Sequence, residues 1–149
     1  MSRISRVLVA NRGEIAVRVI KACHALGKEA VAAVSEADRE SLAAKMADRV
    51  VCIGPARALE SYLKKEAIIA AAVGTKCDAV HPGYGFLAEQ PELAEACADY
   101  GIKFIGPRPE TLREMGNKLW ARKVVKSLGI PVVPGSEKVT SLSEALAAA

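Results

Sequence analysis

Aromatic residues, histidine and net charge are all scarce in this chain of 149 residues. Aromatics make up only 4% of the composition, which argues against the stacking platforms that bind single-stranded nucleic acids. The 21 basic and 17 acidic residues are scattered and leave a net charge of only +4, so the chain has no polybasic arm. We therefore expect no nucleic-acid partner.

Long apolar segments are also missing. The longest apolar run is residues 67–73, whereas a helix needs about 20 apolar residues to span a bilayer. Residues 7–10 are apolar too, but an export signal requires a longer apolar region and a cleavage site. We expect no membrane association, and a location in the cytoplasm or, after processing, in an organelle matrix.

The cysteines do not form the CxxC pairs that are typical of zinc and redox sites. They are widely spaced, at Cys23, Cys52, Cys77 and Cys97. The two histidines, His24 and His81, have no neighbouring ligands at metal-binding spacing. We expect reduced, buried thiols and no metal site in this chain.

Short apolar runs alternate with helical patterns through the first 110 residues. The apolar runs predict strands at residues 6–10, 30–34, 50–53, 79–80 and 103–105. Helical spacing predicts helices at residues 15–26, 41–47, 60–73 and 92–100. Strands that alternate with helices form βαβ units, so we predict an α/β fold, a Rossmann-like parallel sheet with helices on both faces.

The alternation ends after residue 107. Residues 111–115 and 118–128 have helical patterns, and residues 130–135 form a proline-containing extended connector. Ser141 and Glu144 have the spacing of a capping box, but a helix that begins there is too short to be stable alone. We therefore predict a domain at residues 1–110, then a helical connector and the truncated start of another domain at residues 111–149, in a longer polypeptide.

Parallel sheets bind ligands at the carboxyl ends of their strands, where a glycine-rich turn follows the fourth predicted strand. Residues 83–88 match the dinucleotide pattern GxGxxA, but they do not follow the first strand, and no acidic residue ends the next strand. A nicotinamide dehydrogenase is therefore disfavoured. Gly83 and Gly85 could admit a ligand close to the backbone beside Tyr84, or could only shape the turn, which the spacing slightly favours.

Two further polar stretches have competing interpretations. Residues 11–14 could bind an anion at a helix start, but Glu14 would repel it. We favour a turn capped by Asn11 and tied down by Arg12 or Arg18. Lys118 lies in a basic stretch, and its spacing alone does not distinguish it from a solvated surface.

Several motifs occur in a fixed order along the chain. They lie at residues 7–18 (VLVANRGEIAVR), 37–39, 52–55, 61–63, 81–87 (HPGYGFL), 104–107, 115–118 (MGNK) and 133–136, with Glu89. Together they closely resemble the N-terminal, pre-ATP-grasp domain of biotin carboxylase, and the resemblance covers essentially all 149 residues. That domain opens acetyl-CoA, propionyl-CoA and pyruvate carboxylases.

The resemblance implies an ATP-dependent ligase. The family uses MgATP to activate bicarbonate as carboxyphosphate and transfers the carboxyl group to biotin on a carrier protein. The implied cofactors are ATP, Mg²⁺ and carrier-bound biotin, and the implied partners are a biotin carboxyl carrier and a carboxyltransferase. The Gly-rich lid, the metal-binding glutamates and the bicarbonate-binding residues would follow residue 149, so we expect no catalytic residue and no metal ligand here, and no activity from this piece alone.

The resemblance also implies roles for individual residues. Lys118 matches the lysine that contacts the nucleotide, and Tyr84 and Gly85 match the turn that borders the biotin pocket. Arg18 matches an arginine near the subunit interface. Asn117 replaces the usual aspartate beside that lysine, which removes one negative charge.

The first predicted helix departs from the free-standing bacterial enzyme. Lys21 and Ala25 stand where that enzyme has an arginine and a glutamate on its dimer face, so this ion pair cannot form in the same way. We expect a different homo-oligomer or a place within a larger carboxylase. The alternative functions are another ATP-grasp ligase, to which residues 81–86 are a poor match, and a non-catalytic assembly domain.

Overall fold

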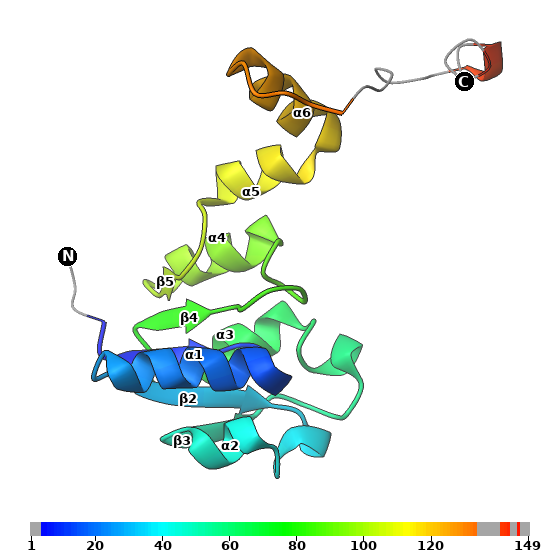
Figure 1. Ribbon diagram of the computed structural model, residues 1–149. Helices are drawn as coiled ribbons and strands as arrows, with labels where there is room; N and C mark the ends of the chain where they lie inside the picture. Colours follow the sequence, from blue (N-terminus) through cyan, green and yellow to red (C-terminus); the bar gives the residue numbers. More distant parts are fainter. Residues whose placement is uncertain (1–3, 134–140, 144–145, 147–149) are drawn as a thin grey trace. The chain divides into compact units, whose positions relative to one another are not determined.

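The chain forms two compact units, residues 1–109 and 110–149. The computed structural model describes residues 4–133, 141–143 and 146. The first unit contains the parallel sheet, and the second contains α6 (Lys118–Ser127) and nearly all of α5 (Pro109–Gly116) (Figure 1).

A five-stranded parallel sheet organises the first unit. Strands and helices follow one another in the order β1 (Arg6–Val9), α1 (Gly13–Ala25), β2 (Glu29–Val34), α2 (Leu42–Met46), β3 (Arg49–Cys52), α3 (Lys65–Gly74), β4 (Ala79–His81), α4 (Pro91–Asp99) and β5 (Lys103–Phe104). The strand order in the sheet is β3-β2-β1-β4-β5. In the centre, Val7 of β1 is in register with Ala30 of β2 on one side and Ala79 of β4 on the other. The predicted strands and the predicted parallel sheet are confirmed.

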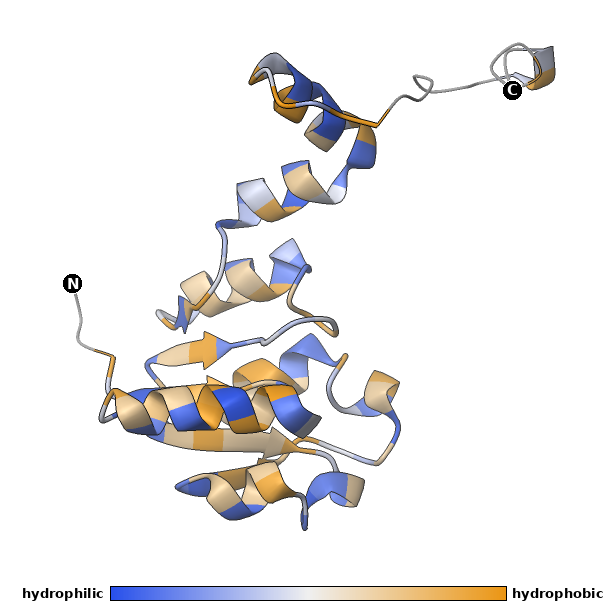
Figure 2. Cartoon of the chain, viewed as in Figure 1, coloured by the Kyte–Doolittle hydropathy of each residue, from blue (hydrophilic) through white to orange (hydrophobic). Residues whose placement is uncertain are grey.

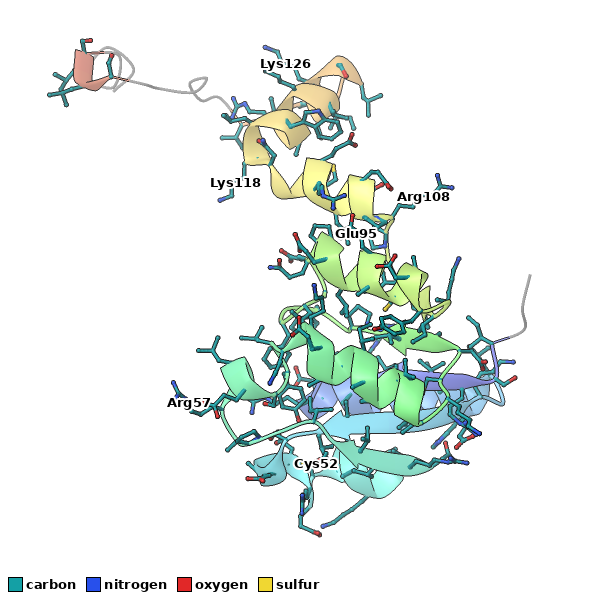
Figure 3. The ribbon with its side chains drawn as sticks, turned by 180° about the vertical axis from the view of Figure 1, so that it is seen from behind. Cys52, Arg57, Glu95, Arg108, Lys118 and Lys126 are labelled. Carbon is teal, nitrogen blue, oxygen red and sulfur yellow. The ribbon has the colours of Figure 1, made fainter. Side chains whose placement is uncertain are left out.

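Helices cover both faces of this sheet, as predicted. Helix α1 lies in front of the sheet in Figure 1, and α3 lies in front of it in the reverse view of Figure 3. The side chains of β1 alternate between these faces: Val7 and Val9 pack in one cluster with Ile20 of α1, whereas Leu8 is fully buried outside that cluster. Figure 2 accordingly shows β2 as largely hydrophobic, whereas α1 carries both hydrophobic and hydrophilic residues.

Helix α3 begins later than the sequence pattern predicts. The prediction of a helix from residue 60 is wrong, because a short 3₁₀ turn, η2 (Ala58–Glu60), precedes it and α3 starts only at Lys65. The Ser61 backbone has a non-helical conformation (φ −136°, ψ −91°), and its hydroxyl donates to the carbonyl of Arg57. Tyr62 therefore lies in the loop before the helix, where it is buried.

The second unit agrees with the two predicted helical pieces. Asn117 separates α5 from α6 and caps α6, because its side-chain oxygen accepts hydrogen bonds from the N–H groups of Leu119 and Trp120, both at 3.1 Å. The predicted capping box falls only partly on the described residues, because Glu144 lies outside them. Within the described residues, no helix combines the length and the apolar character needed to cross a bilayer.

Candidate functional site

The point where the strand order reverses lies between β1 and β4. The loops that follow these strands lead to α1 and α4, and in open α/β sheets such a point opens the crevice in which ligands bind. The two loops are joined directly, because Asn11 Nδ2 donates to the carbonyls of Pro82 (2.7 Å) and Tyr84 (2.8 Å). The candidate site is built on this junction.

The glycine-rich turn after β4 depends on left-handed backbone conformations. Gly83 and Gly85 have φ angles of +67° and +66°. A Cβ atom on Gly83 would lie 2.6 Å from Asn11 Nδ2 and 2.7 Å from Ile15 Cγ2, whereas a Cβ atom on Gly85 would meet nothing within 4 Å. Gly83 therefore serves the packing of the turn, and Gly85 leaves its backbone open to the surface.

Tyr84 stands between these glycines with 63% of its surface exposed. Its phenol donates to Glu14 Oε1 at 3.0 Å, and this hydrogen bond raises the pKa of Tyr84. A cavity of about 340 Å³ is lined by residues 11–15 of the first loop and 84–86 of the turn. The structure therefore brings the two predicted pocket residues, Tyr84 and Gly85, to one accessible cavity.

The first loop differs from its sequence-based interpretation. The prediction that Asn11 caps α1 is wrong: Arg12 occupies the N-cap position without a side-chain hydrogen bond, and the Asn11 amide is directed to the turn. Asn11 Oδ1 accepts instead from the N–H of Arg12 at 2.9 Å. The predicted tie through Arg12 is present, because its guanidinium lies 3.8 Å from the Asp38 carboxylate. Glu14 lies in the first turn of α1, where the helix dipole favours a negative charge.

A partly buried cluster around Tyr62 and Phe86 was not predicted from the sequence. Tyr62 stacks on Phe86 with ring centroids 5.2 Å apart, and the Arg12 guanidinium lies 5.8 Å from the centroid of each ring. The Tyr62 hydroxyl accepts from the N–H of Ser35 (3.0 Å) and donates to Asp38 (2.8 Å). In the sequence, the family motifs at residues 37–39 and 61–63 contain two of its members, Asp38 and Tyr62.

Burial shifts the pKa values of two ring side chains near this junction in opposite directions. Burial raises the pKa of Tyr62 to about 12, with Asp38 adding to the shift, so the phenol keeps its proton at neutral pH. Burial lowers the pKa of His81, whose Nδ1 accepts a hydrogen bond of 3.0 Å from the N–H of Gly83. Both rings therefore support the turn in their neutral forms. Among the described residues, no three His, Cys, Asp or Glu side chains lie together as a metal site would require.

Lys118, the predicted nucleotide contact, belongs to the second unit. It is the first residue of α6 and its side chain is exposed (Figure 3). Arg18, Lys21 and Ala25 are exposed on α1, so the predicted interface residues share one accessible helix. Their roles stay predictions.

Comparison with known proteins identifies the family. Residues 3–112 match the model of the biotin carboxylase N-terminal domain. The chain is 54% identical over 134 residues to the biotin carboxylase of Allochromatium vinosum and 48% identical over 136 residues to biotin carboxylase 1 of Bacillus subtilis. These matches cover 90% and 91% of this chain but 30% of each relative, so the chain spans about a third of the length of such relatives.

Solved structures agree with the sequence matches. The biotin carboxylase domain of a single-chain bacterial carboxylase has a TM-score of 0.90 and 44% identity, covering 96% of this chain and 33% of that one. The biotin carboxylase domain of the Hydrogenobacter thermophilus 2-oxoglutarate carboxylase, solved as a dimer with MgADP and bicarbonate, has a TM-score of 0.90 and 43% identity, covering 97% of this chain and 32% of that one. The chain therefore belongs to the biotin carboxylase family and contains its N-terminal domain.

Proposed function

We propose that this chain is the N-terminal part of a biotin carboxylase, an ATP-grasp ligase that carboxylates carrier-bound biotin with bicarbonate at the expense of MgATP. The observation that carries the proposal is the accessible cavity at the β1–β4 junction, where Tyr84 and Gly85 lie together. These are the two residues that match the biotin-pocket turn of the family. The reaction in this proposal is taken from the family to which the chain belongs.

The turn suits a bicyclic, largely apolar ligand such as biotin. Tyr84 presents an exposed ring whose hydroxyl is engaged by Glu14, and Gly85 leaves space where any other residue would place a side chain. Biotin, when bound, supplies the ureido nitrogen that receives the carboxyl group. The role of Tyr84 is to cover the ring of the ligand, while the backbone of Gly85 comes close to it.

Lys118 suits a contact with the nucleotide phosphates. Its ammonium group is exposed at the start of α6, where Asn117 already satisfies two of the N–H groups of the helix. ATP, when bound with Mg²⁺, supplies the phosphoryl group that activates bicarbonate. Lys118 would offset phosphate charge, and the neutral Asn117 adds no negative charge next to it in the sequence.

The rest of the active site would come from the remainder of a longer chain. We assign no general base and no metal ligand to this chain, so it should be inactive alone. Its partners would be a biotin carboxyl carrier and a carboxyltransferase, which selects the final acceptor, in the cytoplasm or an organelle matrix. The side chains of Lys21 and Ala25 favour assembly other than through the ion-paired dimer of the free-standing enzyme.

Bicarbonate-dependent ADP release by the full-length protein tests this function. We expect free biotin to stimulate turnover in the wild type, Lys118→Ala to weaken it and the 149-residue chain to show none. Lys123→Ala is the matched control, because it removes another exposed ammonium group from α6. If Lys118→Ala leaves activity intact, the chain is better described as an assembly domain. ADP release that ignores biotin and bicarbonate would point to another ATP-grasp substrate.

A further inference from the structure

We propose that Asn11 is a positioning residue for biotin, which it would influence only through the turn that carries Tyr84. This inference rests on the proposed function, because it concerns the same site. Asn11 lines the cavity, but it is only 6% exposed and both of its amide N–H donors are committed to the turn. Its amide holds the backbone on both sides of Gly83, and the direction of the Tyr84 side chain follows from that backbone.

The contacts of Asn11 use most of its hydrogen-bonding capacity. The residue is only 6% exposed, its Nδ2 donates to two carbonyls of the turn, and its Oδ1 accepts from its own loop at the N–H of Arg12. An asparagine amide has two N–H donors, and both are committed to the turn. One planar group therefore fixes the first loop relative to the second.

The two carbonyls that Asn11 holds belong to Pro82 and Tyr84, on either side of Gly83. Gly83 has a left-handed φ of +67°, and a Cβ atom there would lie only 2.6 Å from Asn11 Nδ2. The missing side chain of Gly83 is thus what lets the amide come close enough for both hydrogen bonds. Gly83 and Asn11 form a matched pair across the junction.

Other contacts of Tyr84 cannot replace this one. The hydrogen bond between Tyr84 and Glu14 is exposed to solvent, so water competes with it. The stack of Phe86 on Tyr62 holds the turn two residues farther along. Loss of the Asn11 donors would leave two carbonyls of the turn without their partner and free the Tyr84 backbone to move.

Two variants distinguish the effect of losing the Asn11 N–H donors from the effect of losing the whole side-chain amide. Asn11→Asp keeps the size and the acceptor oxygen but removes both N–H donors, and Asn11→Ala removes the whole amide. In the full-length protein we expect either change to raise the KM for free biotin about tenfold or more, since the buried carbonyl of Pro82 and the partly buried carbonyl of Tyr84 lose their donors. The KM for MgATP should stay within about twofold of the wild type, because Lys118, the proposed nucleotide contact, belongs to the second unit.

Ser41→Ala is the control for a purely structural effect. Ser41 caps α2 by accepting from the N–H of Ala44, and its backbone groups bond to Asp38 and Lys45, so its loss costs stability alone. The proposal is overturned if both Asn11 variants keep the KM for biotin, or if Ser41→Ala raises that KM equally. If free biotin does not stimulate turnover of the wild type, the proposed function fails and the role of Asn11 fails with it. If free biotin does stimulate the wild type but the Asn11 variants keep its KM for biotin, only the role of Asn11 is rejected.

Discussion

The two glycines of the turn should respond very differently to the same substitution. Gly83 and Gly85 have nearly equal φ angles, +67° and +66°, so an alanine pays a similar backbone cost at either position. Only at Gly83 does the added Cβ atom meet other atoms, Asn11 Nδ2 at 2.6 Å and Ile15 Cγ2 at 2.7 Å. The Asn11 amide is held by two hydrogen bonds to the turn itself, and Ile15 belongs to α1, so neither neighbour can move away freely.

The magnitudes follow from these two contributions. A left-handed conformation costs an L-residue about 1–2 kcal/mol, which applies to both variants. Overpacking adds about 1–3 kcal/mol, which applies to Gly83→Ala alone. We therefore expect Gly83→Ala to be less stable than Gly85→Ala by roughly 2 kcal/mol. The unfolded-state entropy lost by replacing glycine is common to both variants and cancels in the comparison.

Urea unfolding of the 149-residue chain measures this difference. With an m-value of about 2 kcal/mol per M, the midpoint of Gly83→Ala should lie about 1 M below that of Gly85→Ala. Equal midpoints would refute the reasoning, because the close approach at Gly83 would then carry no energetic weight. A larger effect at Gly85 would mean that its surface is packed rather than open.

Three further predictions concern the same chain. Tyr62→Phe should destabilise it by about 1–3 kcal/mol in urea, because the buried N–H of Ser35 loses its acceptor; an unchanged midpoint would contradict this. Hydrogen bonds from two backbone N–H groups lower the pKa of Asp78 in the folded chain. The stability that they contribute is present above about pH 4, the pKa of an unfolded aspartate, and is lost as the pH falls through the lower pKa of the folded state. Asp78→Asn should therefore weaken the fall in stability at acid pH, and an unchanged pH dependence would contradict this. The expectation that all four thiols are buried is wrong for Cys52, which is exposed at the end of β3. Interaction with the Arg39 side chain lowers the pKa of the Cys52 thiol, whereas burial raises the pKa of the other three thiols. Iodoacetamide should therefore modify Cys52 first and Arg39→Ala should slow that reaction, and an unchanged rate would contradict this reasoning.

The fold could be predicted from the sequence because its signals are local. Each strand is a short apolar run and each helix has its own spacing, so their alternation alone indicates a parallel sheet. The start of α3 was misplaced because helical spacing continues back through Tyr62, while the chain there is turned by a 3₁₀ segment and by the Ser61 hydroxyl. A tertiary contact, the stack of Tyr62 on Phe86, determines the position of that aromatic ring instead.

The candidate site was only partly predictable for the same reason. The family resemblance of the contiguous motif at residues 81–87 indicated Tyr84 and Gly85, and both line one cavity in the structure. The sequence alone favours Asn11 as a helix cap, since the side chain of an asparagine before a helix usually accepts a hydrogen bond from an N–H group of the first turn. Its actual partners, Pro82 and Tyr84, lie more than 70 residues away in the sequence, and no local pattern encodes that pairing.

The turn is held from both ends, and this explains how it can combine strain with an exposed ring. Phe86 has a φ of +44°, a conformation that costs a residue with a side chain about 1 kcal/mol or more. The stack on the buried Tyr62 ring offsets this cost on one side of Tyr84, and the two hydrogen bonds of Asn11 hold the other side. Because the backbone is fixed on both sides, Tyr84 can keep one direction without being buried itself. A ligand that binds against its ring would then meet a surface already in place, which reduces the ordering cost of binding.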